Sequence, residues 1–175
     1  EVGTSPTRAI RPTPILPAEE DRVLLLLPDR FAEFRARTSE LKVLRHASET
    51  SLGTFLDMTL AQDGGIWIAG AQGIAKVPGR IRQINRDTKW REYVLPPDFA
   101  VRNLLRPFDD DDGGVTVVAD DPSVNKRVLV HFDGTNWLSY SALREGLRYA
   151  WRDTEPGKFW GLTMSALLRI DTNSG

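Results

Sequence analysis

An internal repeat is the sequence feature that most constrains how this chain can fold. Residues 63–70 read Asp-Gly-Gly-Ile-Trp-Ile-Ala-Gly and align with residues 112–119 at an offset of 49. A third copy at residues 157–163 places Trp160 under Trp67 at an offset of 93. Each copy continues into a second short apolar run. The chain is therefore expected to fold as a series of similar units.

A second landmark repeats with nearly the same period. The pattern Trp-x-x-Tyr occurs at residues 90–93 and again at residues 137–140, which is an offset of 47. Around both landmarks, short apolar runs are separated by Gly, Asp and Asn. That texture is typical of strands and turns, and it lacks the 3, 4, 7 spacing of helices. We expect helices to be nearly absent.

The length of the repeated unit predicts the architecture. Four strands in about 40 to 50 residues make one blade of a β-propeller. We expect strands at about 54–61, 66–70, 74–78 and 90–94 in one blade and at about 101–107, 115–119, 127–132 and 136–140 in the next. A last, partial blade has strands at about 147–153, 158–163 and 166–171. Upstream, the runs at 23–27, 31–37 and 41–44 fit the second, third and fourth strands of an earlier blade.

The predicted fold class is therefore all-β, a partial β-propeller of four-stranded blades. About three and a half blades are expected, at about 22–46, 54–94, 101–140 and 147–171. Residues 1–21 contain four prolines and few large apolar groups, so we expect a Pro-rich lead-in or linker there. A half ring would leave long strand edges unpaired. We therefore expect either a fragment of a longer protein or a self-associated pair of halves.

Several repeated residues have an expected structural role. Trp67 and Trp160 are predicted to pack between neighbouring blades, because the run around Trp67 suits a strand that is covered on both faces. Gly64 and Gly65 are predicted to form a hairpin turn in which positive φ is needed. These residues explain the fold and leave the function open.

Composition excludes several classes of function. The formal net charge of −1 provides no large field to attract nucleic acid. The absence of cysteine excludes disulfides, thiolate catalysis and Cys-based zinc sites. The longest apolar run, residues 23–27, is far shorter than the roughly 20 residues of a membrane span. We expect no nucleic-acid partner and no membrane span in this chain.

The repeat resembles the two-component regulator propeller repeat, whose copies combine an Asp and Gly turn, a hydrophobic-Trp pair and a following Gly-Leu strand. The best matching residues are Asp63, Gly65, Ile66, Trp67, Gly73 and Ile74, and partial matches are Trp160, Arg169, Ile170 and Asp171. The middle copy departs from the pattern because Thr116 replaces the Trp. The resemblance implies the periplasmic or extracellular sensor domain of a bacterial receptor whose membrane helix and signalling domain lie outside these residues.

Few residues point to catalysis. His46 and His131 are the only histidines, and no Gly-x-Ser-x-Gly turn or nucleophile elbow is present. We interpret both histidines as structural or surface residues and assign no catalytic and no cofactor-binding residue. A metal-dependent propeller lyase or hydrolase is kept as one alternative. A carbohydrate-binding, lectin-like propeller is kept as another.

An acidic run offers the most conspicuous polar cluster. Asp109–Asp112 precede Gly113 and Gly114, and Asp120 and Asp121 follow. Carboxylates are calcium ligands, but the match to a calcium-binding helical hand is poor because the flanking segments are predicted strands. We interpret the run as an acidic turn equivalent to residues 62–65. No metal ligand is assigned.

Two further segments are rich in arginine. A basic stretch comprises Arg80, Arg82, Arg86, Lys89 and Arg91. Its scattered charges favour a solvated outer face. Aromatic and basic residues alternate in a later segment that comprises Arg144, Arg148, Tyr149, Trp151 and Arg152. This composition is typical both of ligand contact and of blade packing.

The leading hypothesis is a non-catalytic sensory or binding propeller of a bacterial signal-transduction protein. The expected partner is a small molecule, a glycan or a protein, with ligand-binding residues unassigned and no cofactor. A second copy of the chain, or further blades, is expected to complete the ring. Because propellers host many unrelated sites, the fold does not fix the ligand.

Overall fold

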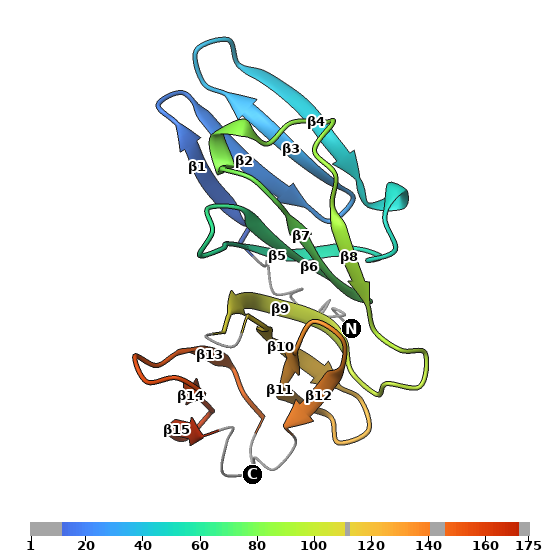
Figure 1. The fold of residues 1–175 in the computed structure, drawn as a ribbon, viewed down its shortest axis with the longest axis vertical. Coiled ribbons are helices and arrows are strands. Elements are labelled where there is room, and N and C mark those ends of the chain that lie inside the picture. Colours follow the sequence, from blue (N-terminus) through green and yellow to red (C-terminus); the bar gives the residue numbers. More distant parts are fainter. Residues whose placement is uncertain (1–11, 111–112, 141–145, 172–175) are drawn as a thin grey trace, which may run out of the picture.

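The computed structural model describes residues 12–110, 113–140 and 146–171. It contains four antiparallel sheets, and each is formed by strands that are consecutive in sequence and neighbours in space. Figure 1 shows β1–β4 at the top, β5–β8 below them, and β13–β15 at the lower left beside β9–β12. We call them blades 1 to 4. The predicted partial β-propeller of four-stranded blades is confirmed.

Three blades are complete and the fourth has three strands in the described residues. Blade 1 contains β1 (Ile15–Glu19), β2 (Arg22–Leu27), β3 (Arg30–Arg35) and β4 (Glu40–His46). Blade 2 contains β5 (Phe55–Leu60), β6 (Ile66–Gly70), β7 (Gly73–Val77) and β8 (Arg91–Val94). Blade 3 contains β9 (Arg102–Asp109), β10 (Val115–Asp121), β11 (Lys126–Phe132) and β12 (Trp137–Tyr140). Blade 4 contains β13 (Tyr149–Arg152), β14 (Lys158–Leu162) and β15 (Leu167–Asp171).

Helical structure is nearly absent from the described residues, as expected. It consists of two three-residue 3-10 turns, η1 (Ala47–Glu49) and η2 (Ile81–Gln83). No helix in the described part of the chain has the length and apolar character needed to cross a bilayer.

One boundary differs from the prediction. Residues 1–21 were expected to be a lead-in, but β1 at Ile15–Glu19 pairs with β2 and gives blade 1 its first strand. The prolines obscured this strand, because proline is tolerated at the edge of a sheet while it lowers the apparent strand signal. Pro17 lies on β1, which is an edge strand. Residues 1–11 of the predicted lead-in lie outside the described residues.

The core consists of apolar layers between blades. Strand β6 is buried on both faces, as predicted: Ile66 and Ile68 belong to the layer against blade 1, and Trp67 and Ala69 belong to the layer against blade 3. This alternation follows from the two-residue period of a strand. A third, smaller layer that includes Phe159 joins blades 3 and 4. Packing between neighbouring blades therefore forms most of the buried apolar core.

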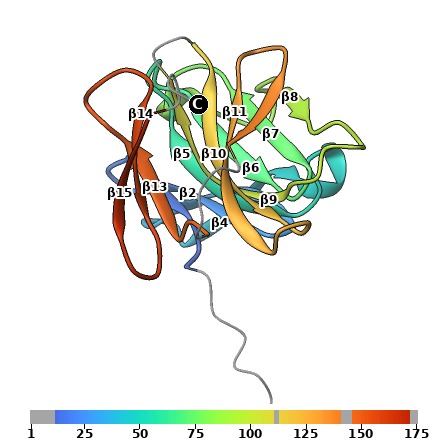
Figure 2. The same ribbon diagram turned by 90° about the horizontal axis from the view of Figure 1, so that it is seen from below.

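Trp67 and Trp160 occupy equivalent places with different surroundings. Trp67 is 7% exposed and packs toward blade 3, which confirms its predicted role between blades. Trp160 lies on the opposite face of β14 from Phe159 and is only half-buried. Figure 2 shows β14 and β15 at one edge of the molecule. In the described residues no sheet covers that face of blade 4.

The first strand of each blade lies toward its neighbours' first strands. Strand β5 packs along β9, while β1 contacts β5 and β13 contacts β9. The fourth strands β4, β8 and β12 form the opposite edges of their sheets. Residues on the first strands therefore come together from several blades, which is where a shared site can form.

Candidate functional site

The repeated Gly-Gly pair has a similar backbone arrangement in blades 2 and 3. Gly64 and Gly113 both have φ of +84°, and each donates its N–H to the carbonyl oxygen three residues earlier, at 3.0 and 3.2 Å. Gly65 is required for a different reason, because a Cβ there would lie 2.6 Å from the carbonyl oxygen of Val77. The predicted turn is confirmed, with positive φ at Gly64 and a close backbone approach at Gly65.

Acid–base pairs join the first hairpin of a blade to its third strand. Blades 2, 3 and 4 each pair an acidic residue next to the first turn with a basic residue on the third strand. These pairs are Asp63 with Lys76 at 3.0 Å, Asp110 with His131 at 2.8 Å, and Asp153 with Arg169 at 2.6 Å. These acid–base pairs therefore have a structural role in blades 2, 3 and 4.

These contacts change the acidity of two carboxyl groups. The hydrogen bond from Arg169 lowers the pKa of Asp153 to about 2. Burial raises the pKa of Asp63, but the N–H of Gly65 and the Lys76 ammonium outweigh burial and leave the pKa below its ordinary value. Both carboxylates are therefore charged at neutral pH.

The acidic run is partly used to hold blades together. Asp109 accepts hydrogen bonds from the Trp67 indole and from the main-chain N–H of Gln62, both at 2.6 Å, and so joins blades 2 and 3. Asp120 accepts from Asn103 and Arg127, and Asp121 accepts from Ser123. Asp111 and Asp112 lie outside the described residues. Within the described residues no group of three His, Asp or Glu side chains could hold a metal ion.

His131 lies in a buried polar cluster in which Asp110 and Thr116 do not have the geometry of a catalytic relay. Its Nδ1 is 2.8 Å from Asp110 Oδ2 and 3.2 Å from Thr116 Oγ1, while Thr116 also donates to the same carboxylate at 2.5 Å. A relay needs the acid and the nucleophile on opposite ring nitrogens. Here both contact one nitrogen. Thr116 stands at the repeat position that Trp67 and Trp160 occupy in blades 2 and 4.

His46 ends β4 and lies on the surface beside a hollow between blades 1 and 2. This hollow has a volume of about 630 Å³, and its lining includes Asp29, Thr50 and Ser51. The main-chain N–H of His46 donates to Glu49 at 2.7 Å. Asp29 lines the same hollow, and within the described residues no ion pair joins its carboxylate to His46, so we assign His46 no chemistry.

The basic stretch lies on an exposed loop and strand. Its five side chains, those of Arg80, Arg82, Arg86, Lys89 and Arg91, are all exposed. Main-chain carbonyl groups of this loop accept hydrogen bonds from Arg22 of blade 1. The arginine side chains themselves face solvent, in agreement with the interpretation as a solvated face.

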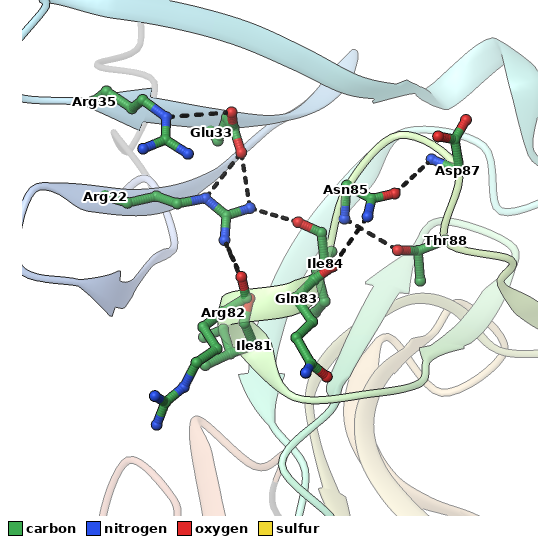
Figure 3. A network of polar contacts seen from close by, with 10 residues as sticks. All are labelled: Arg22, Glu33, Arg35, Ile81, Arg82, Gln83, Ile84, Asn85, Asp87 and Thr88. Carbon is green, nitrogen blue, oxygen red and sulfur yellow. Dashed lines mark hydrogen bonds and ion pairs between the residues drawn. The ribbon is translucent and has the colours of Figure 1, made fainter.

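A buried Arg–Glu pair, which the sequence did not reveal, ties this loop to blade 1. Figure 3 shows Arg22 of β2 between Glu33 of β3 and the loop that contains η2. Arg22 donates to Glu33 at 2.8 Å and to the carbonyl oxygens of Arg82 and Ile84 at 3.0 and 2.5 Å. Arg22 is 3% exposed and Glu33 is 7% exposed. Because both partners are buried and paired, this contact fixes blade 1 against blade 2.

The larger cavity lies on the first strands and is the candidate functional site. We call it the axial cavity, and its volume is about 830 Å³. Its walls come from three blades: Leu56, Asp57 and Thr59 of β5, Leu105 and Arg106 of β9, and Arg148 and Tyr149 at the start of β13. Pro12, Thr13 and Pro14, which lead into β1, lie at its edge. This volume is within the range of about 300 to 1,000 Å³ that small ligands occupy.

Strand β9 is irregular where it lines the cavity. Two residues of β9, Arg106 and Pro107, lie opposite the single residue Val117 of β10, which makes a β-bulge. Arg106 has φ of +51°, a conformation that is uncommon outside glycine. Such bulges re-aim a side chain, and strained residues cluster at binding sites. Arg106 is thereby directed across the cavity, where its guanidinium lies 4.3 Å from the centre of the Tyr149 ring.

The aromatic and basic segment supplies part of this cavity. Arg148 and Tyr149 line it, and Tyr149 and Trp151 are each 44% exposed on β13. Arg144 lies outside the described residues. This segment stands out in the sequence but its partners do not, because Asp57 and Arg106 are brought to it only by the stacking of three blades. The bulge at Arg106 carries no recognisable sequence signal.

Comparison with known proteins adds structural relatives at low identity. No protein-family model matches the chain, and no curated protein matches its sequence. The extracellular domains of two hybrid two-component systems from B. thetaiotaomicron are similar, with TM-scores of 0.64 and 0.61 at 14% and 10% identity. These likenesses cover 91% and 92% of this chain but 20% and 22% of the other chains.

A third similar structure is regucalcin, a calcium-binding protein from Agrobacterium tumefaciens. It has a TM-score of 0.58 at 16% identity and covers 92% of this chain and 57% of the regucalcin chain. The chain thus spans about a fifth of the length of the two extracellular domains that it resembles. At these identities, the likeness shows the β-propeller fold and its presence in extracellular domains of bacterial two-component systems.

Proposed function

We propose that this chain is part of a non-catalytic sensory or ligand-binding β-propeller in a bacterial signal-transduction protein. The observation that carries the proposal is the axial cavity, because its walls are shared by blades 2, 3 and 4. A ligand there contacts several blades at once and can change how they pack. The structural likeness to extracellular domains of two-component systems supports the sensory role and a periplasmic or extracellular location.

Completion of the ring is part of this proposal. Blade 4 has three strands in the described residues and exposes Trp151 and Leu167, while its half-buried Trp160 lies on the uncovered face. Blade 1 likewise exposes Ile15 and Leu41. Apolar side chains on sheet faces at both ends suit packing against further blades. We propose that these are supplied by further sequence of a longer protein or by a second copy of the chain.

A lectin-like propeller is the second candidate function, and the exposed aromatic residues of β13 favour it. Tyr149 and Trp151 are both 44% exposed, although aromatic side chains of this size are usually more buried. Exposed aromatic rings offer flat apolar surfaces to sugar rings. The experiment below separates the two functions by the class of compound that binds and by the residues that binding requires.

Thermal-shift measurements on the 175-residue chain test the proposal. The compound panel contains neutral sugars, sugar acids, organic acids and amino acids. We expect a compound that raises the melting temperature of the wild type and fails to stabilise Tyr149→Ala to the same extent. Arg80→Ala is the matched control, because Arg80 is exposed and lies outside the cavity. The proposal is contradicted if no compound stabilises the chain, or if both variants respond as the wild type does.

A further inference from the structure

The charge of the axial cavity differs from that of the whole chain. The sequence carries a formal net charge of −1. Among the described residues that line the cavity, four are basic, Arg106, Lys126, Arg127 and Arg148, and one is acidic, Asp57. A cleft lined by one sign of charge concentrates ligands of the opposite sign. We propose that the axial cavity binds a small organic anion through Arg106 and Arg148, an inference that rests on the function proposed above.

Arg106 and Arg148 are the two cations that carry this proposal. Arg127 already donates to the carboxylate of Asp120 at 3.0 Å, so its charge is partly neutralised. Arg106 and Arg148 are exposed, and within residues 12–110, 113–140 and 146–171 neither guanidinium has a carboxylate partner. An exposed guanidinium without a carboxylate partner presents its N–H donors to a ligand.

The position of Arg106 is set before any ligand arrives. Its backbone is bulged at a φ of +51°, and its side chain lies over Tyr149. The carboxylate of Asp57 accepts the main-chain N–H groups of Arg106 and Met58, at 3.1 and 2.9 Å. Asp57 therefore helps to hold the bulge through the main chain. A side chain placed in this way loses less entropy when it binds.

The ligand class follows from size, charge and lining. A volume of about 830 Å³ admits a compound of one or a few rings and excludes a folded domain. Leu56, Leu105 and Leu147 give the cavity apolar walls that suit the body of such a compound. The guanidinium fork matches planar or tetrahedral oxyanions, often with two parallel hydrogen bonds. The ligand is therefore an organic molecule that carries carboxylate, sulfate or phosphate groups.

Isothermal titration with charged and neutral probes tests the inference. The anionic probes are citrate, glucose 6-sulfate and glucose 6-phosphate, which separate the three oxyanion chemistries, and glucose is the neutral probe. Each is titrated into the 175-residue chain at low and at physiological salt. The cavity variants are Arg106→Gln and Arg148→Gln. The matched controls are Arg80→Gln and Arg86→Gln, which remove the same charge from exposed positions outside the cavity.

We expect at least one anionic probe to bind, glucose to bind more weakly, and each cavity variant to weaken the anion about tenfold or more. The affinity should also fall as salt rises, while the control variants stay within about twofold of the wild type. Because the two cavity variants are independent, misfolding of one leaves the other as the test.

Three results would overturn the inference. The first is that no anion binds at up to about 10 mM, a concentration that detects dissociation constants near 1 mM. The second is equal weakening in cavity and control variants, which would assign the effect to the overall charge. The third is binding of glucose that depends on Tyr149 but not on Arg106 or Arg148. That third result refutes the anionic ligand while it retains the proposed binding function.

Discussion

Replacement of Trp67 by alanine tests how the blades are held together. The side chain is 7% exposed, packs between blades 2 and 3, and donates its indole N–H to Asp109 at 2.6 Å. Burial on this scale removes about 200 Å² from water, worth about 5 kcal/mol at about 25 cal/mol per Å². The alanine side chain retains a small part of this buried area. We therefore expect Trp67→Ala to lower the free energy of unfolding by about 3 to 5 kcal/mol.

Trp160→Ala is the matched control, because the same residue type at the equivalent position of blade 4 is only half-buried. Its expected cost is about 1 kcal/mol. Urea unfolding followed by circular dichroism gives both values without relying on tryptophan fluorescence. If Trp67→Ala does not fold, Trp67→Phe takes its place, because it retains most of the packing and loses the hydrogen bond to Asp109. Trp67→Phe should lower the free energy of unfolding by about 1.5 to 3 kcal/mol. A smaller loss at Trp67 than at Trp160 would refute the packing of blade 2 against blade 3.

Three other predictions concern polar and backbone features. The pKa of Asp153 is lowered to about 2 from about 3.9, so its contribution to stability is present above about pH 4 and is lost as the pH falls toward 2. Asp153→Asn should flatten that part of the curve of urea midpoint against pH. Glu33→Ala should lower the free energy of unfolding by about 3 to 5 kcal/mol, because Arg22 is then buried without its carboxylate partner. The double variant with Arg22→Met and Glu33→Met should lower it less, and calorimetry compares the two proteins. Gly65→Ala should cost about 1 to 3 kcal/mol, measured by urea unfolding, because its Cβ would meet the carbonyl oxygen of Val77.

The repeat could be predicted because its residues act locally. Glycine turns, strand alternation and the cross-strand position of Trp67 depend on neighbours within one blade, so each copy carries its own signal. The pairing of Asp153 with Arg169 also lies within one blade. The sequence alignment placed Asp112 under Asp63, whereas in blade 3 the acid paired with the third strand is Asp110. The turn has the same length in both blades, and Asp110 lies two positions earlier in it than Asp63 does.

The candidate site could not be predicted because it depends on how blades stack. Asp57 and Arg106 lie 49 positions apart in the chain, and a main-chain N–H joins them only once blades 2 and 3 are side by side. Arg22 likewise meets carbonyl groups of a loop about 60 positions away. First strand β1 was missed because its prolines weaken the local strand signal. Contacts between blades thus account for most of what the sequence left open.

A diffraction structure of the chain bound to its strongest ligand tests the central claim most directly. We predict ligand density in the axial cavity, with an anionic group against the guanidinium groups of Arg106 and Arg148 and with contacts to β5, β9 and β13. Density in the hollow beside His46, or on the outer edges of the blades with the axial cavity empty, would contradict the account.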